Sequence, residues 1–391
     1  MTTKIGVGLD NSLDGLKCGR EAARSALNHL GSARPSLALL FTSHPDCNQV
    51  LKGINEILQG VPIIGTTSAG EYTHQGYVEK GAGVMLIYSQ QIQFHPIEHR
   101  QKRFQRRQRL LGTLQGLTAT GLGSHLNYRA LVLFPDNESM NLDSVVDQAM
   151  TETAMLYDII GGPGLASPSS ERPPAIFHNQ HTFRAGFSGT EILSQNPFGL
   201  AVANGWQPIS GPYRVTAADE KRIIKIDGRP AREVYEDFIA TQGLKFMPKL
   251  EADLLLKYPI GICKKNKTCK VSMSKYFDVQ GALLMTSPPL VGKLIHILRT
   301  QPDFMVTAAQ RAIHQAQQHM QAQPASGALF IDCMSTGLVL DKGYHQQQEA
   351  IRQSLGNIPF LGFRSHGVLA RLQGQTTGHY ECSVATCMLP T

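Results

Sequence analysis

Residues 61–71 read VPIIGTTSAGE, and this stretch decides how the chain is expected to fold. An apolar run of strand length ends at Gly65, and three hydroxyl side chains, a second glycine and Glu71 follow it. Glycine accepts positive φ angles and lets two backbones approach closely, which a sharp turn at a strand end requires. The pattern therefore predicts a strand that ends in a loop, with backbone N–H groups and hydroxyls around one small space.

Two weaker copies of this pattern occur later in the chain, YDIIGGPGLAS at 157–167 and IPFLGFRSHG at 358–367. A strand-like segment and a helix-like segment precede each copy, as they precede the first. A short strand–helix–strand crossover implies parallel strands joined in a right-handed sense. We therefore predict an α/β fold with mixed α+β sheets and an internally duplicated unit of strand, helix, strand, glycine loop and strand.

The length and composition indicate a two-domain globular protein. The 391 residues suffice for two cores, and we place the domains at 1–194 and 195–391. Hydrophobic residues make up 42% and charged residues 17%, which excludes a disordered chain or a coiled coil. No apolar run approaches the roughly 20 residues of a membrane span, and the first residues lack a signal-peptide pattern. We expect a cytoplasmic protein.

The seven cysteines do not form a disulfide framework, because their number is odd and they are scattered. The nearest match to a zinc-site arrangement is Cys263 and Cys269 in CKKNKTCK, where we favour a lysine-rich hairpin turn over a disulfide or a metal site. The histidines form no HxH or HExxH arrangement, so we predict no metal and no cofactor. A helix is expected at 290–300.

A basic run between Arg100 and Arg109 carries six positive charges and no acid. We predict a helix here, which could bind nucleic acid or an anionic membrane surface. Phe104 is its only aromatic residue, and no nucleic-acid-binding motif accompanies it. A solvated helix face or a surface for an acidic protein partner is the favoured interpretation.

Three segments in this order resemble one known family. They are PIIGTTSAGE at 62–71, the segment from 196 to 238 that contains GWQPISGPYRV and IDGRPAREVY, and NIPFLGFRSHG followed by GQTTG at 357–378. Together they are similar to proteins built from paired FIST N and FIST C domains, and the resemblance covers nearly the whole chain. It implies a sensory module of signal transduction that binds a small molecule such as an amino acid and signals through a protein partner.

The resemblance is incomplete near the C-terminus. Gly70 and Glu71 match the Gly-Glu pair of the family's N-terminal loop, whereas His366 and Gly367 stand where the C-terminal loop ordinarily repeats it. The family's Cys-x-x-Arg matches at Cys333, but residue 336 is threonine. A C-terminal site that used both a carboxylate and an arginine would be altered here.

The N-terminal loop is the first candidate ligand site. Glu71 could bind the ammonium group of a small ligand, while loop N–H groups bind its carboxylate. The alternative is that the hydroxyls satisfy the backbone and Glu71 is solvated. The residues predicted to bind the ligand in this loop are Gly65, Thr66, Thr67, Ser68, Gly70 and Glu71.

The C-terminal candidates are Cys333 and the loop residues Arg364, Ser365 and His366. A Cys333 thiolate activated by His366 or His345 would make a thiol-dependent enzyme. No nucleophile-elbow motif surrounds this cysteine, so a buried core thiol or a ligand-lining thiol is favoured over catalysis. The three loop residues could bind an anionic ligand or form a surface turn.

Overall fold

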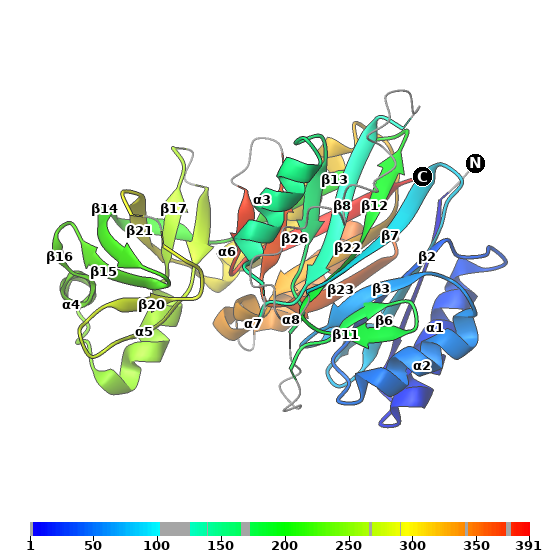
Figure 1. Cartoon of the computed structure of the whole chain (residues 1–391), viewed down its shortest axis with the longest axis horizontal. Helices are drawn as coiled ribbons and strands as arrows, with labels where there is room; N and C mark the ends of the chain where they lie inside the picture. Colours follow the sequence, from blue (N-terminus) through cyan, green and yellow to red (C-terminus); the bar gives the residue numbers. More distant parts are fainter. Residues whose placement is uncertain are drawn as a thin grey trace.

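The computed structural model describes residues 3–101, 126–138, 140–165, 173–265, 268–289, 291–340, 343–372 and 377–391. Within these ranges the chain forms eight α-helices and four sheets, which confirms a mixed α/β protein. Three sheets build a large body, and the fourth forms a smaller lobe at the left of Figure 1. Most of the predicted basic helix, residues 102–109, lies outside the described residues, and Arg100 ends a strand.

The first sheet is built around a parallel strand pair. Strand β2 (Leu37–Thr42) continues through helix α2 (Cys47–Leu58) into the parallel strand β3 (Ile63–Thr67), with Leu40 opposite Gly65. Helix α1 (Gly15–Leu30) joins α2 on one face, where apolar side chains of both helices pack on the sheet. The order of the sheet is β1 (Lys4–Asp10), β6 (Ala82–Tyr88), β2, β3, β10 (Ile176–His178) and β11 (His181–Phe183).

The second and third sheets have the same order of parallel and antiparallel neighbours. The second runs β7 (Ile92–Arg100), β12 (Gly186–Ser194), β8 (Tyr128–Pro135), β9 (Asp158–Gly161), β24 (Val368–Arg371) and β25 (Gly378–Tyr380). The third runs β13 (Gly199–Ala203), β26 (Val384–Pro390), β22 (Ala325–Cys333), β23 (Phe360–Ser365), β4 (Glu71–Thr73) and β5 (Gly76–Val78). In each, the central pair is parallel, as the sequence predicts.

The crossovers of these two sheets are also helical. Helix α3 (Leu142–Glu152) joins β8 to β9, and helices α7 (Met334–Leu340) and α8 (Tyr344–Leu355) join β22 to β23. Helix α6 (Pro302–His319) packs beside α8 on the third sheet. Each sheet therefore has one face covered by helices and one face turned towards the other two sheets.

The outer hairpin of every sheet comes from a different part of the chain. The hairpin β4–β5 follows β3 in sequence but pairs with β23 of the third sheet. The hairpin β10–β11 follows β9 but pairs with β3, and β24–β25 follows β23 but pairs with β9. This cyclic exchange ties the three sheets into one body.

The inner faces of the three sheets share one apolar core. Phe41, Phe134 and Phe363 meet there; the rings of Phe41 and Phe363 stack with centroids 3.7 Å apart, and Phe134 contacts both edge-on. The same core contains a cavity of about 20 Å³ whose lining is almost entirely apolar. That volume holds one water molecule at most, so the centre of the body is a packed core.

The lobe is a seven-strand antiparallel path with two helices. Its order is β18 (Cys269–Ser272), β17 (Ile260–Cys263), β21 (Leu294–Arg299), β14 (Gln207–Asp219), β15 (Arg222–Ile226), β20 (Leu283–Met285) and β19 (Ser274–Phe277). The short β16 (Arg229–Pro230) pairs with β15, and helices α4 (Ala231–Thr241) and α5 (Glu251–Lys257) pack on the apolar face. The three-sheet body contains strands from before and after residue 194. The division of the chain into domains 1–194 and 195–391 therefore stays a prediction.

Two sequence predictions for the lobe were wrong. Residues 294–299 form the strand β21 instead of part of a helix, because Ile295 and Ile297 alternate into the lobe core between β14 and β17. The lysine-rich turn is a hairpin as expected, but Cys263 and Cys269 face each other across its strands and form a disulfide.

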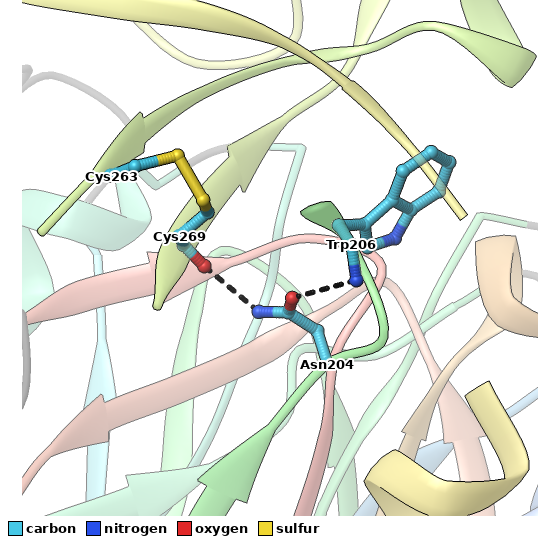
Figure 2. The surroundings of a disulfide bond; sticks show 4 residues. All are labelled: Asn204, Trp206, Cys263 and Cys269. Carbon is cyan, nitrogen blue, oxygen red and sulfur yellow. Dashed lines mark hydrogen bonds between the residues drawn. A yellow bond between two sulfur atoms is a disulfide. The ribbon is translucent and has the colours of Figure 1, made fainter. Parts of the chain in front are cut away.

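The disulfide lies where the lobe meets the body (Figure 2). Asn204 Nδ2 donates to Cys269 O at 2.8 Å, and Trp206 N donates to Asn204 Oδ1 at 3.2 Å. These bonds connect the hairpin to the segment that leaves β13. Within the described ranges, no helix is long and apolar enough to cross a membrane.

Truncating Phe363 to alanine should lower the free energy of unfolding by about 3–5 kcal/mol, because its fully buried ring contacts two other sheets. Denaturant unfolding followed by circular dichroism measures this change. Leu13→Ala is the matched control, since that side chain is 92% exposed and should change stability by less than about 0.5 kcal/mol. Equal effects in both variants would contradict a shared central core.

Candidate functional site

The three predicted glycine loops lie next to one another where the parallel strand pairs end. Leu165 N donates to Thr67 O at 3.0 Å, which joins the first and second loops. Ala69 N donates to Arg364 O at 3.0 Å, and Arg364 N donates to Gly70 O at 2.9 Å. His366 N donates to Pro163 O at 3.4 Å and closes the triangle. Bonds between the loops therefore occupy backbone N–H groups that were predicted to bind a ligand.

The hydroxyls of the first loop bond to the neighbouring chain segment. Thr66 Oγ1 donates to Ala175 O at 2.9 Å, and Ala175 N donates to Thr67 Oγ1 at 2.9 Å. Gly65 has φ of +155°, and a Cβ there would lie 1.8 Å from Leu40 O, so the close approach of β3 to β2 requires glycine. These contacts give the loop a structural role.

Glu71 is buried, so the expectation that it could be solvated was wrong. Ser43 Oγ donates to Glu71 Oε2 at 2.9 Å, and Ser68 Oγ donates to Oε1. Burial raises the pKa of Glu71 to about 8, although both hydroxyl bonds act in the opposite direction. At neutral pH this carboxyl is therefore largely protonated. Its role as a ligand group stays a prediction.

The pairing of β4 with β23 and of β24 with β9 shows which residue of the C-terminal loop corresponds to Glu71. It is not Gly367, as the sequence alignment of the two loops had predicted. Tyr72 pairs with Gly362, and Leu369 pairs with Gly161 in the equivalent position of the next sheet. Val368, one residue before Leu369, therefore corresponds to Glu71, and it is fully buried. An apolar residue replaces the carboxyl in this loop.

Arg364 belongs to a mostly buried polar cluster and does not form a surface turn. Its Nη1 donates to Tyr77 Oη at 3.0 Å, and its guanidinium lies 4.9 Å from the centre of the Tyr344 ring. Tyr344 Oη donates to Asp332 Oδ2 at 2.9 Å, and burial raises the pKa of Asp332 to about 7. Ser365, the next residue, is buried and donates to Gly367 O.

Cys333 ends β22 and is buried, which fits the core-thiol interpretation better than an exposed nucleophile. Its backbone N donates to Ser383 O at 3.1 Å. His345, one of the two histidines considered as its base, is exposed on α8. The other, His366, lines a cleft on the lobe side of the body.

This cleft has a volume of about 260 Å³ and is lined from both the body and the lobe. The body contributes the start of α3, the loop after β23 and the residues around β25, and the lobe contributes two turns. Polar groups dominate the lining, and the cleft lies at the carboxyl end of the parallel pair β8–β9, where ligands bind in α/β sheets. The side chains that line it include those of Asn141, Lys221, Thr286, His366, His379 and Glu381.

Glu381 connects the body to the lobe inside the cleft. Its Oε2 accepts hydrogen bonds from Met273 N and from Thr286 Oγ1, both at 2.6 Å. Burial raises the pKa of Glu381 to about 7, so the carboxyl changes charge near neutral pH. A ligand with a positive charge would favour the ionised form.

Two histidines form the adjoining wall. The rings of His366 and His379 are nearly parallel with centroids 6.3 Å apart, and His379 Nε2 donates to His366 O at 2.9 Å. Burial lowers the pKa of both rings, to about 4 for His379, so both are neutral at pH 7. His366 Nδ1 is buried without a hydrogen-bond partner among the described residues.

The start of α3 adds a region suited to anions. Asn141 caps the helix by accepting from Ser144 N at 3.1 Å, and the remaining first-turn N–H groups carry partial positive charge. Asp143 in this turn is paired with Lys270 at 2.8 Å and accepts from His379 N at 2.9 Å. Its negative charge is therefore largely compensated, and Lys221 supplies a further cation from the lobe.

Sequence reasoning found His366 but missed the rest of this wall. Glu381 and Thr286 are 95 residues apart and meet only because the lobe folds back on the body. His379 lies in β25 of the exchanged hairpin β24–β25, and Glu381 follows directly after that strand. No local pattern marks these residues. Among the described residues, no group of three or more His, Cys, Asp or Glu side chains could hold a metal ion.

The chain belongs to the FIST domain family. The FIST N domain model matches residues 36–229, and the FIST C domain model matches residues 231–371. The resemblance seen in the sequence is thereby confirmed over most of the chain.

Similar full-length proteins occur in mycobacteria. An uncharacterized protein of Mycobacterium tuberculosis is 22% identical over 393 residues, covering 96% of this chain and 97% of the relative. An uncharacterized protein of Mycobacterium bovis is 23% identical over 392 residues, covering 96% of each. Among solved structures, a chorismatase aligns over 100% of both chains with 10% identity and a TM-score of 0.37. A TM-score below 0.5 does not establish a shared fold, so we draw no conclusion from this similarity.

Glu71→Gln should flatten the pH dependence of stability. The pKa of Glu71 is raised from 4.5 to about 8, so its stabilising contribution is complete below pH 4.5 and is lost as pH rises through 8. One proton changes the slope of unfolding free energy by about 1.4 kcal/mol per pH unit in that window. Urea unfolding at several pH values between 5 and 8 measures the difference from wild type.

Glu79→Gln is the control for this prediction, because the Glu79 side chain is 64% exposed and should leave the wild-type slope unchanged. A Glu71→Gln protein with the slope of the wild type would show that the Glu71 carboxyl does not titrate in this window.

Proposed function

We propose that this FIST family protein is a sensory module of signal transduction that binds a small polar molecule in the cleft between body and lobe. One observation carries the proposal: Glu381, His366 and Lys221 line a single cleft of about 260 Å³, with the start of α3 beside them. Acidic, neutral and basic groups that converge in one concave site suit a small ligand with both donors and acceptors.

The chemistry of the wall suits an amino acid. An ammonium group would pair with Glu381, whose pKa lies close enough to neutrality for the ligand to ionise it. A carboxylate would accept from the first-turn N–H groups of α3 and pair with Lys221. His366 Nδ1, which has no hydrogen-bond partner in the described part of the chain, would accept a further ligand donor.

Binding in this cleft would transmit a signal by changing the contact between the body and the lobe. Glu381 already joins them through Met273 N and Thr286 Oγ1, so a ligand that bonds Glu381 alters the same contact. A change in lobe position would alter the surface that a partner protein recognises. The predicted loop residues contribute by holding His366 in place, since His366 N bonds to the second loop and Arg364 to the first.

We also infer that the three-sheet body arose by internal duplication. The common order of parallel and antiparallel neighbours in the three sheets supports this inference. The glycines at equivalent register positions, Gly65, Gly161 and Gly362, support it as well.

A thermal-shift screen of amino acids and central metabolites tests the proposed ligand site. A ligand that raises the melting temperature of the wild type should bind about 10- to 100-fold more weakly to His366→Ala and to Glu381→Gln, because each loses a buried hydrogen bond to the ligand. Isothermal titration calorimetry of the strongest hit gives the affinities.

Glu79→Gln serves as the matched control, since its exposed carboxylate lies outside the cleft. Wild-type affinity in both cleft variants would contradict the proposal. If only Glu71→Ala lost binding, the ligand site would be assigned to the N-terminal loop instead of the cleft.

A further inference from the structure

The disulfide between Cys263 and Cys269 joins the two strands of a surface hairpin of the lobe. The two cysteines form the last register pair of β17 and β18, and the hairpin tip beyond them is exposed at Lys264, Lys265 and Thr268. Cys263 is partly exposed, whereas Cys269 is 4% exposed and belongs to the apolar cluster at the junction with the body. A small molecule in solution therefore approaches the disulfide from the side of Cys263.

Strand β18 connects the lobe to the body. Lys270 Nζ, one residue after Cys269, pairs with Asp143 Oδ1 of α3 at 2.8 Å. Met273 N, directly after β18, donates to Glu381 Oε2 at 2.6 Å. Because β18 is the outermost strand of the lobe sheet, β17 holds it from one side through ladder hydrogen bonds. The disulfide therefore ties to β17 a strand that contacts the body.

The same strand is linked to the only tryptophan of the chain. Asn204 Nδ2 donates to Cys269 O at 2.8 Å, and Trp206 N donates to Asn204 Oδ1 at 3.2 Å (Figure 2). The Trp206 side chain is 3% exposed and belongs to the same apolar cluster as Cys269. Because indole emission moves to longer wavelength when water reaches the ring, the fluorescence of Trp206 reports on the junction beside the disulfide.

We propose that the Cys263–Cys269 disulfide is a reversible modification site whose state controls how firmly the lobe contacts the body. A small anionic thiol such as glutathione reduces it, and the oxidised form of that thiol restores it. The exposed Lys264 and Lys265, directly after Cys263, favour the approach of an anionic thiol. This site is independent of the ligand proposed for the cleft.

Reduction takes two thiol–disulfide exchange steps. In the first, the thiolate of the small molecule attacks Cys263 Sγ, the bond between the two cysteines breaks, and Cys269 leaves as a thiolate that takes up a proton. In the second, another thiolate attacks the sulfur of the bound small molecule, and Cys263 leaves as a thiolate that also takes up a proton. Two small thiols thus give two electrons and two protons to the protein and leave as one oxidised disulfide.

Reduction would loosen the contact between body and lobe. The pairing of β18 with β17 then depends on backbone hydrogen bonds and apolar packing, and such pairing opens locally more easily without a cross-link. Opening at Cys269 breaks its hydrogen bond with Asn204 and weakens the ion pair between Lys270 and Asp143. The junction is therefore firmer in the disulfide form than in the dithiol form.

Treatment of the full chain with reduced glutathione under native conditions, followed by thiol counting and hydrogen exchange, tests the proposal. The count should rise from the five free cysteines to all seven. The amides of β18 and of residues 204–206 should then exchange about 10-fold faster, and the emission of Trp206 should move to longer wavelength. Oxidised glutathione should reverse all three changes. These measurements require no variant, so they are informative even if substitutions impair folding.

Variants assign the change to this disulfide. The double variant Cys263→Ser, Cys269→Ser should exchange at the faster rate with or without glutathione. Cys47→Ser is the matched control, since Cys47 is also partly exposed but is a free thiol in α2, and it should respond to glutathione as the wild type does. A wild-type count that stays at five, or a count of seven with unchanged exchange in β18, would overturn the proposal. Fast exchange throughout the lobe, α4 and β15 included, would overturn it too, because reduction would then unfold the lobe instead of loosening its junction.

Discussion

The structure depends on hydrogen bonds between backbones of loops that are far apart in sequence. Each parallel strand pair ends in a loop whose N–H and C=O groups must find partners, because an unpaired buried backbone group is costly. The loops at Gly65, Gly161 and Gly362 meet this requirement with one another, and the following hairpin then pairs with the next sheet. Each sheet is completed by a hairpin from another part of the chain, so the three sheets form one body.

The same arrangement explains why buried acids gather at the ends of the parallel pairs. Glu71, Asp332 and Glu381 each lie at such an end, and each is covered by another segment that excludes water. Burial raises the pKa of all three, and hydroxyl or backbone donors hold each one. Of these three acids, Glu381 lines the cleft between the body and the lobe.

Local patterns sufficed for the central pairs of all three sheets but not for the neighbours of those pairs. Apolar runs and helix faces near Leu40, Leu133 and Phe330 identify strand, helix and strand within about 30 to 40 residues. No local sequence pattern predicts which sheet each outer hairpin joins, because this pairing depends on contacts between distant segments. The strand β21 was mistaken for a helix for the same reason, since its pairing with β14 and β17 decides its conformation.

The sequence by itself determined the family, the α/β class and the glycine loop at 61–71, because these depend on residue order and backbone freedom. Tertiary structure alone decided what the loop's side chains do. Thr66 and Thr67 bond a segment more than 100 residues away, and Glu71 is enclosed by Ser43 and Ser68. The cleft at Glu381 exists only because the lobe folds against the exchanged hairpin, a contact that no local pattern encodes.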